Sequence, residues 1–222
     1  MFKRHVFLIY LSFAALNAFP QEKDFGVWYN IEAEKEMFND LGFFLAGALR
    51  TYMNASEIEE YFIECMIDYK INNYLSLAGN YRLNNNIEEN DKYYPGHRWA
   101  ADFNATYDIG RFDLSGRSRI QQRNKTYFED KEDKIPDVHA RFRLKARYKI
   151  PDFPINPYTS LEFFYPLNKE YERDVEKKRF IAGMEYKISQ QHFIEIEYMH
   201  QRDYMPELED DSIIGLTYIF EF

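Results

Sequence analysis

The sequence predicts an all-β protein, a single antiparallel up-and-down transmembrane β-barrel preceded by a cleaved signal peptide. Three observations lead to this prediction. The final segment has an unbroken apolar face, and a long series of alternating segments precedes it. In addition, no apolar run after the first residues is long enough for a spanning helix, so membrane insertion would require a barrel.

The final segment, 213–222, has the length and period of a transmembrane β-strand. Its apolar face carries Ile214, Leu216, Tyr218, Phe220 and Phe222. We expect Tyr218, Phe220 and Phe222 to form the strand that directs membrane assembly. For this pattern alone, the edge strand of a soluble sheet is the alternative.

Residues 1–18 have the anatomy of a secretory signal peptide. Lys3 and Arg4 are followed by the apolar run 6–15, and Ala18 supplies a small residue for cleavage. A membrane-anchoring helix would need about 20 apolar residues, whereas this run is shorter and stops before Pro20. We therefore expect residues 19–222 to form the barrel domain.

Composition agrees with an exported barrel. Aromatic residues make up 18% of the chain although the mean hydropathy is only -0.60, which suits strands with one aromatic and one charged face. The net charge of -9 gives no support for nucleic-acid binding. Cys65 is the only cysteine, so no internal disulfide is possible.

Eleven alternating segments are separated by turn-forming residues. They are 25–34, 41–53, 57–69, 74–83, 98–108, 111–123, 138–149, 157–165, 177–188, 192–203 and 211–222. Bacterial single-chain barrels have even strand numbers. We therefore expect ten full strands, with segment 25–34 as a partial or inward-folded strand. A twelfth strand hidden in a long loop is the alternative.

The connections between segments alternate in length. Those at 71–73, 109–110 and 189–191 are tight, whereas those at 84–96, 124–136 and 166–176 are long and charged. In outer-membrane barrels the short turns face the periplasm and the long loops face outward. We expect the same arrangement here.

One face of several segments is heavily charged. Within 141–149, cations occupy every odd position, opposite Phe142, Leu144, Ala146 and Tyr148. Because a bilayer tolerates only the apolar face, we expect the charged face to line the lumen. The predicted lumen charge network, with a structural role, is Glu60, Glu64, Asp68, Asp102, Arg117, Arg119, Arg123, Arg141, Arg143, Lys145, Arg147, Glu162, Glu195 and Glu197.

We expect these charges to pair across strands and to fill the lumen, because unpaired charges in a narrow lumen are costly. A soluble lipocalin-like barrel would place apolar residues inside instead. An open sheet with one solvated face would leave the aromatic face uncovered.

A set of short motifs recurs in order along the chain: the pairs Tyr81-Arg82 and His97-Arg98 and the stretches 117–123, 141–148 and 158–165. In these motifs the chain resembles domain-of-unknown-function family 2490, a family of outer-membrane barrels from Gram-negative bacteria. The resemblance covers nearly the whole mature chain. Gln122 replaces the acidic residue usual before the last arginine of the first stretch. The resemblance implies an outer-membrane barrel of this size but supplies no activity or catalytic residues.

The residues themselves predict no catalytic, cofactor or metal site. His97, His139, His192 and His200 lie in different segments, without metal-ligand spacing. His97 and His200 fall on the lipid side near the external rim, where a lipid hydrolase could use them, and Ser56 and Ser212 lie near that rim. Neither histidine has an obvious cross-strand serine partner in the sequence.

Two further features have simple explanations. Trp28 and Trp99 suit the aromatic girdles of a barrel. The acidic runs 127–134 and 207–211 could bind Ca²⁺ or bridge lipopolysaccharide through divalent ions, but they match no calcium-loop pattern.

The sequence thus favours an outer-membrane barrel without enzymatic activity, structural or surface-interacting, with a side-chain-filled polar lumen. A narrow pore for small solutes and a lipid-modifying enzyme are the alternatives. The expected partners are outer-membrane lipid, lipopolysaccharide and the barrel-assembly machinery.

Overall fold

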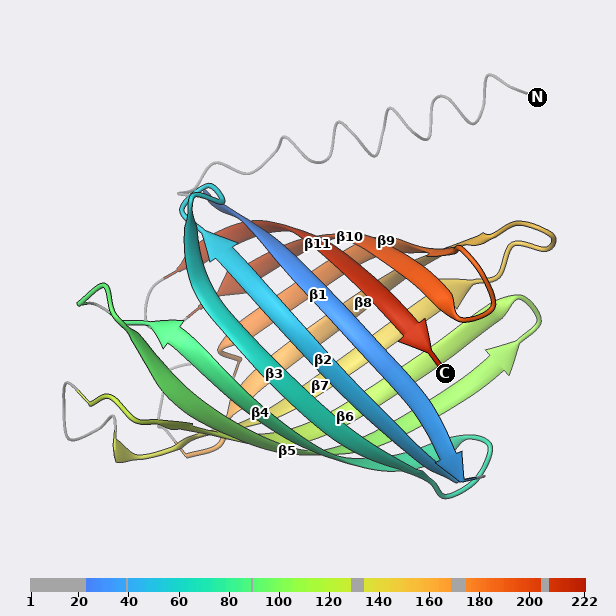
Figure 1. Cartoon of the computed structure of the whole chain (residues 1–222), viewed down its shortest axis with the longest axis horizontal. Coiled ribbons are helices and arrows are strands. Elements are labelled where there is room, and N and C mark those ends of the chain that lie inside the picture. The colour runs from blue at the N-terminus through green and yellow to red at the C-terminus, as the bar shows by residue number, and fades with distance from the viewer. Residues whose placement is uncertain (1–22, 39, 89, 129–133, 169–174, 205–207) are drawn as a thin grey trace.

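The computed structural model describes residues 23–38, 40–88, 90–128, 134–168, 175–204 and 208–222. Within these residues, eleven strands close into one barrel, which confirms the predicted all-β fold (Figure 1). The predicted signal peptide lies outside the described residues. The strands are β1 (Lys23–Phe38), β2 (Leu41–Tyr52), β3 (Glu57–Lys70), β4 (Leu75–Ile87), β5 (Tyr93–Ile109), β6 (Phe112–Lys125), β7 (Asp137–Tyr148), β8 (Ile155–Pro166), β9 (Lys177–Lys187), β10 (His192–Asp203) and β11 (Glu209–Glu221).

The seam of the barrel corrects the expected strand number. Segment 25–34 belongs to β1, which is a full strand of the wall and pairs with β2 on one side and β11 on the other. All neighbours along the chain pair antiparallel, but β1 and β11 run in the same direction and pair parallel, from Lys23↔Asp210 to Glu34↔Glu221. When strands alternate in direction, the first and last of an odd number run the same way, so they can close the barrel only as a parallel pair. The described strands therefore form a closed barrel of eleven, and not of the expected ten or the alternative twelve.

The two rims of the barrel differ in their connections. We call one the turn rim; its connections are 39–40, 71–74, 110–111, 149–154 and 188–191. The other, the loop rim, has the connections 53–56, 88–92, 126–136, 167–176 and 204–208. In the tightest turn Gly110 has a φ of +61°, a conformation that glycine adopts at little cost.

The predicted loop 84–96 is wrong. β4 continues to Ile87 and β5 begins at Tyr93, so the connection spans only 88–92. Asn84 pairs with Gly96, and Asn85 pairs with Pro95. Asparagine, proline and glycine are typical of turns. Here, however, the antiparallel pairing of β4 with β5 continues through these residues.

The two faces of the wall are inverted relative to a soluble protein. Outward-facing residues such as Ile63 and Leu144 are large and apolar yet 62% and 67% exposed, whereas inward-facing residues such as Glu162 are charged and only 3% exposed. An apolar outer belt around a polar interior is the arrangement of a transmembrane barrel. No helix in the described ranges is long and apolar enough to cross a membrane.

Candidate functional site in the barrel lumen

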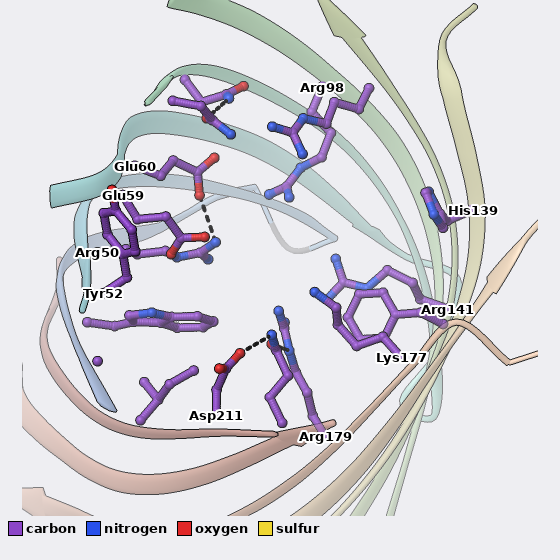
Figure 2. Close-up of a pocket in the computed structure, with 18 of the residues that line it drawn as sticks. Arg50, Tyr52, Glu59, Glu60, Arg98, His139, Arg141, Lys177, Arg179 and Asp211 are labelled. Carbon is purple, nitrogen blue, oxygen red and sulfur yellow. Dashed lines mark hydrogen bonds and ion pairs between the residues drawn. The ribbon is translucent and has the colours of Figure 1, made fainter. Parts of the chain in front are cut away.

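The lumen contains a cavity of about 980 Å³ that reaches the loop rim. Side chains from all eleven strands line it, and Figure 2 shows Glu59 and Glu60 on one side with Arg98, His139 and Lys177 opposite. We call this cavity the vestibule. Its volume corrects the expectation that side chains fill the whole lumen, because a space next to the loop rim remains hollow.

The first group of ion pairs lies on the wall formed by β2–β5. Glu64 accepts a hydrogen bond from Arg82 at 2.7 Å and one from Arg98 at 3.1 Å. Glu60 accepts one from Arg50 at 2.7 Å. Each carboxylate therefore faces a guanidinium on a neighbouring strand, which offsets the cost of burying its charge.

A second group forms around Glu162 on β8. Its Oε1 accepts hydrogen bonds from Arg117 at 2.7 Å and Arg141 at 2.9 Å, and Arg179 lies 3.8 Å from its Oε2. Three cations from β6, β7 and β9 thus surround one carboxylate. These four residues join strands that are adjacent in the barrel wall.

Asp102 and Arg119 form a bidentate pair in the lumen. Two hydrogen bonds of 2.6 Å join the Nε and Nη2 atoms of Arg119 to the two carboxylate oxygens. This fork geometry is the strong form of an arginine–carboxylate contact. Asn80 also contacts both residues, at 3.2 Å and 3.3 Å.

Charged and aromatic side chains also meet in the lumen nearer the turn rim. Glu195 lies 3.7 Å from Lys145 and 3.8 Å from Arg147. Tyr158 donates to Glu197 at 2.8 Å. A Cβ at Gly183 would lie 2.7 Å from the Tyr158 ring, so the glycine accommodates this aromatic side chain.

The remaining members of the predicted network are placed differently. Asp68 accepts a hydrogen bond from Ser76 at 2.7 Å. Arg123 lines the vestibule. Arg143 is in register with Glu162, but no ion pair of Arg143 falls within 4.0 Å among the described residues. Lys149, the last cation of the row, lies beyond β7 and pairs with Asp113 at 2.6 Å.

Trp28 is not a girdle residue, contrary to our prediction. It points into the lumen and is 8% exposed, and the Arg50 guanidinium lies 4.0 Å from its ring centroid. In the alternation of β1, Trp28 falls on the same face as the charged Glu32, and Tyr29 falls on the other face. This pattern in the sequence could have revealed that Trp28 faces the lumen. It belongs to an apolar cluster with Tyr158, Ile181, Met199 and Ile213.

This apolar cluster lies on the lumen side of β1 and β8–β11. Trp28 and Ile213 also line the vestibule, whereas Tyr158, Lys145, Glu195 and Glu197 do not. We call the part of the lumen around these four residues the constriction.

The outer wall contains the other predicted residues. His97 Nδ1 lies 2.7 Å from the Tyr81 hydroxyl, and Trp99 is 57% exposed, as expected for a girdle. Phe220 and Phe222 stack with ring centroids 5.2 Å apart at the end of β11. The prediction that His200 lacks a cross-strand serine was wrong, because the register places Ser212 directly opposite it.

In the described part of the chain, no three histidine, cysteine or carboxylate side chains gather closely enough to hold a metal ion. The acidic runs that we considered for Ca²⁺ extend beyond the described residues at 129–133 and 207.

Two solved structures are similar to this chain, and the first of them supports the architecture. The NanC porin aligns with a TM-score of 0.53 and 12% identity, over 80% of this chain and 86% of the porin. The beta domain of the Bordetella autotransporter BrkA aligns with a TM-score of 0.47 and 10% identity, over 80% and 78% of the two chains. No protein with a curated description matches the sequence.

A family model described as "Protein of unknown function (DUF2490)" matches residues 25–211. This match spans β1 to the first residues of β11, and therefore almost the entire barrel wall. The chain accordingly belongs to the DUF2490 family, and it folds as a β-barrel of the outer-membrane type.

Proposed function

We propose that this protein is an outer-membrane barrel that admits a small polar solute through its vestibule and passes it through a narrow constriction. The observation that carries this proposal is the cavity of about 980 Å³ open at the loop rim. A barrel with a purely structural role has no need of such a space, and the cavity favours a pore over the filled lumen that the sequence suggested.

The charges of the vestibule indicate the kind of solute. Charged side chains of both signs line it: Glu59 and Glu60 stand with Arg50 on one side, and Arg98, Lys177 and Arg179 stand opposite (Figure 2). Closely spaced charges of both signs create strong local fields in the cavity, which orient dipolar or multiply charged solutes. The proposed solute is therefore small, hydrated and ionic.

The outer-membrane location is part of the proposal. It is supported by the exposed apolar belt, by the aromatic end of β11 and by the likeness of the fold to a porin. Lipopolysaccharide and outer-membrane lipid would contact the belt, and the barrel-assembly machinery would insert the chain. The predicted lumen network would then brace the wall around the vestibule.

The constriction provides the test. Tyr158 projects into it between Glu197 and the Lys145 ammonium, which lies 3.8 Å from the ring centroid. We expect purified wild-type protein to give small, discrete conductance steps in planar bilayers, and Tyr158→Ala to give larger ones because a ring is removed. Leu144→Ala, on the lipid face, is the control and should conduct like the wild type. Silence from both the wild type and Tyr158→Ala would overturn the proposal.

A further inference from the structure

A serine, a histidine and an aspartate meet on the outer wall near the loop rim. β10 and β11 pair so that His200 is directly opposite Ser212, and Asp210 lies two residues before Ser212 on the same strand. Residues two apart on a strand share a face. The neighbouring residues Gln201, Asp211 and Ile213 line the vestibule, so His200, Asp210 and Ser212 face outward.

The carboxylate of this group is buried and fixed. Asp210 is only 2% exposed, although it lies on the outer wall. Its two oxygens accept hydrogen bonds of 2.7 Å from the Nε and Nη2 atoms of Arg202. His200 Nε2 lies 3.5 Å from Asp210 Oδ1. The aspartate is therefore held in place with one oxygen directed at the imidazole.

The serine lies directly across the strand pair from the same imidazole. Side chains directly opposite each other on an antiparallel pair have Cβ atoms about 4.5–5.5 Å apart. The Ser212 hydroxyl now contacts the Tyr198 hydroxyl at 3.2 Å. To act on His200, this hydroxyl would turn away from Tyr198 by rotation about its single side-chain torsion, between staggered wells.

We propose that Ser212, His200 and Asp210 are nucleophile, general base and orienting carboxylate of a lipid acyl hydrolase on the outer wall. This arrangement of roles is what ester hydrolysis by a serine requires. It is an activity separate from passage through the lumen. The vestibule and this group open on opposite faces of the wall.

The position of the group identifies the substrate class. It lies at the loop-rim ends of β10 and β11, where the barrel wall leaves the bilayer core and lipid ester bonds are located. His200 is in register with Phe180 on its other side, and Phe180 is large, apolar and exposed. An acyl chain can lie along this apolar wall while its ester reaches Ser212. The substrate is a fatty-acyl carboxylic ester of a membrane lipid.

The reaction balances without a cofactor. His200 takes the proton of the Ser212 hydroxyl as its oxygen attacks the ester carbonyl carbon, and the ester C–O bond breaks. The leaving alkoxide receives that proton and departs as the deacylated lipid. Water then gives a proton to His200 and attacks the acyl-serine, which releases the fatty acid and restores Ser212.

The test uses the full protein reconstituted in vesicles. One set contains phosphatidylethanolamine and phosphatidylglycerol, and the other contains the same lipids with lipid A. Fatty acids released over time are measured by mass spectrometry. We expect release in at least one set, and the set that gives it tells whether a glycerophospholipid or lipid A is the source.

Two serine variants separate catalysis from background. Ser212→Ala should lower release on the order of 10³-fold or more, as loss of a nucleophile does. Ser118→Ala should match the wild type, because Ser118 is an exposed serine of the outer wall flanked by Phe103 and Phe142. Heat-modifiable migration on gels verifies that each variant is folded. Release that persists in folded Ser212→Ala would overturn the proposal.

A covalent probe makes the test independent of variant folding. A fluorophosphonate with a long alkyl chain should modify Ser212 in the wild-type protein, and peptide mass spectrometry locates the adduct. His200→Gln should reduce this labelling, because the serine loses its base. A folded wild type that takes no label and releases no fatty acid from either vesicle set would refute the assignment.

Discussion

At the scale of single residues, alternation in the sequence was sufficient to assign faces but not partners. The cations of 141–147 do lie on the lumen side of β7, opposite Phe142 and Leu144. Which carboxylate each cation meets depends on the register between strands and on the tilt of the wall. Arg141 reaches Glu162, whereas Arg143, two residues away, has no ion pair within 4.0 Å among the described residues.

Because alternation does not reveal cross-strand partners, the sequence also failed to predict that Ser212 lies opposite His200. His200 and Ser212 are separated by a connection, 204–208, whose length sets the register of β10 on β11. A shift of one residue would place Ser212 on the lumen side. Sequence alone does not fix this register, so only the paired ladder brings the two side chains together.

Glu162 allows the value of the lumen pairs to be measured. Glu162→Gln removes the charge that Arg117 and Arg141 share but preserves the side-chain shape, which leaves the half-buried Arg117 and the buried Arg141 with a weaker partner. We expect the free energy of unfolding to fall by about 3–5 kcal/mol, as when one member of a buried pair is lost. Urea unfolding in lipid vesicles, monitored by tryptophan fluorescence, gives the measurement.

The neighbouring Leu161 is the control. It is 47% exposed on the outer wall, and Leu161→Ala retains every lumen contact. It should change the free energy of unfolding much less than Glu162→Gln. Equal effects of the two variants would mean that the ion pairs around Glu162 do not support the wall.

At the scale of elements, all eleven predicted segments correspond to strands, because period-two alternation is a strong signal. The errors occur where local chemistry and tertiary pairing disagree. The turn-like residues 84–96 continue the ladder of β4 and β5. β1 is a full strand because β11 offers it a parallel partner, a contact between the two ends of the barrel that no local pattern encodes.

The end of β11 provides a prediction about assembly. Phe222 stacks on Phe220, its amide donates to the Glu34 carbonyl at 3.0 Å, and the Lys35 ammonium lies 4.6 Å from its ring centroid. Deleting Phe222 removes the aromatic end and a bond across the seam. We expect less folded protein in the outer-membrane fraction, seen as loss of the heat-modifiable band.

Tyr218→Phe is the matched change in the same strand. It keeps the aromatic ring and removes only the hydroxyl that contacts His192 at 2.6 Å. Its heat-modifiable band should remain close to the wild-type amount. If deletion of Phe222 leaves assembly intact, or if the folded protein is soluble in the periplasm, our account of the final strand is wrong.

At the scale of the whole molecule, the two rims predict an orientation. The loop rim, with the longer connections, should face the cell exterior, and the turn rim should face the periplasm. In a Cys65→Ala background, Lys92→Cys marks the loop rim and Asn73→Cys marks the turn rim, at exposed positions. A membrane-impermeant maleimide should label Lys92→Cys on intact cells and Asn73→Cys only after lysis. The opposite labelling pattern would mean that the loop rim faces the periplasm and the turn rim faces the cell exterior.

The seam between β1 and β11 has a consequence for how the molecule forms. The Asn30 amide donates to the Thr217 hydroxyl across 187 residues of chain, and the backbone ladder along the seam joins equally distant segments. Contacts of such long range are slow to form, because the chain must be confined before they contribute. Until β11 arrives, both edge strands expose unpaired amides and carbonyls that hydrocarbon cannot satisfy. Closure is therefore the committed last step, and a helper that covers the two open edges would protect the unfinished barrel from aggregation.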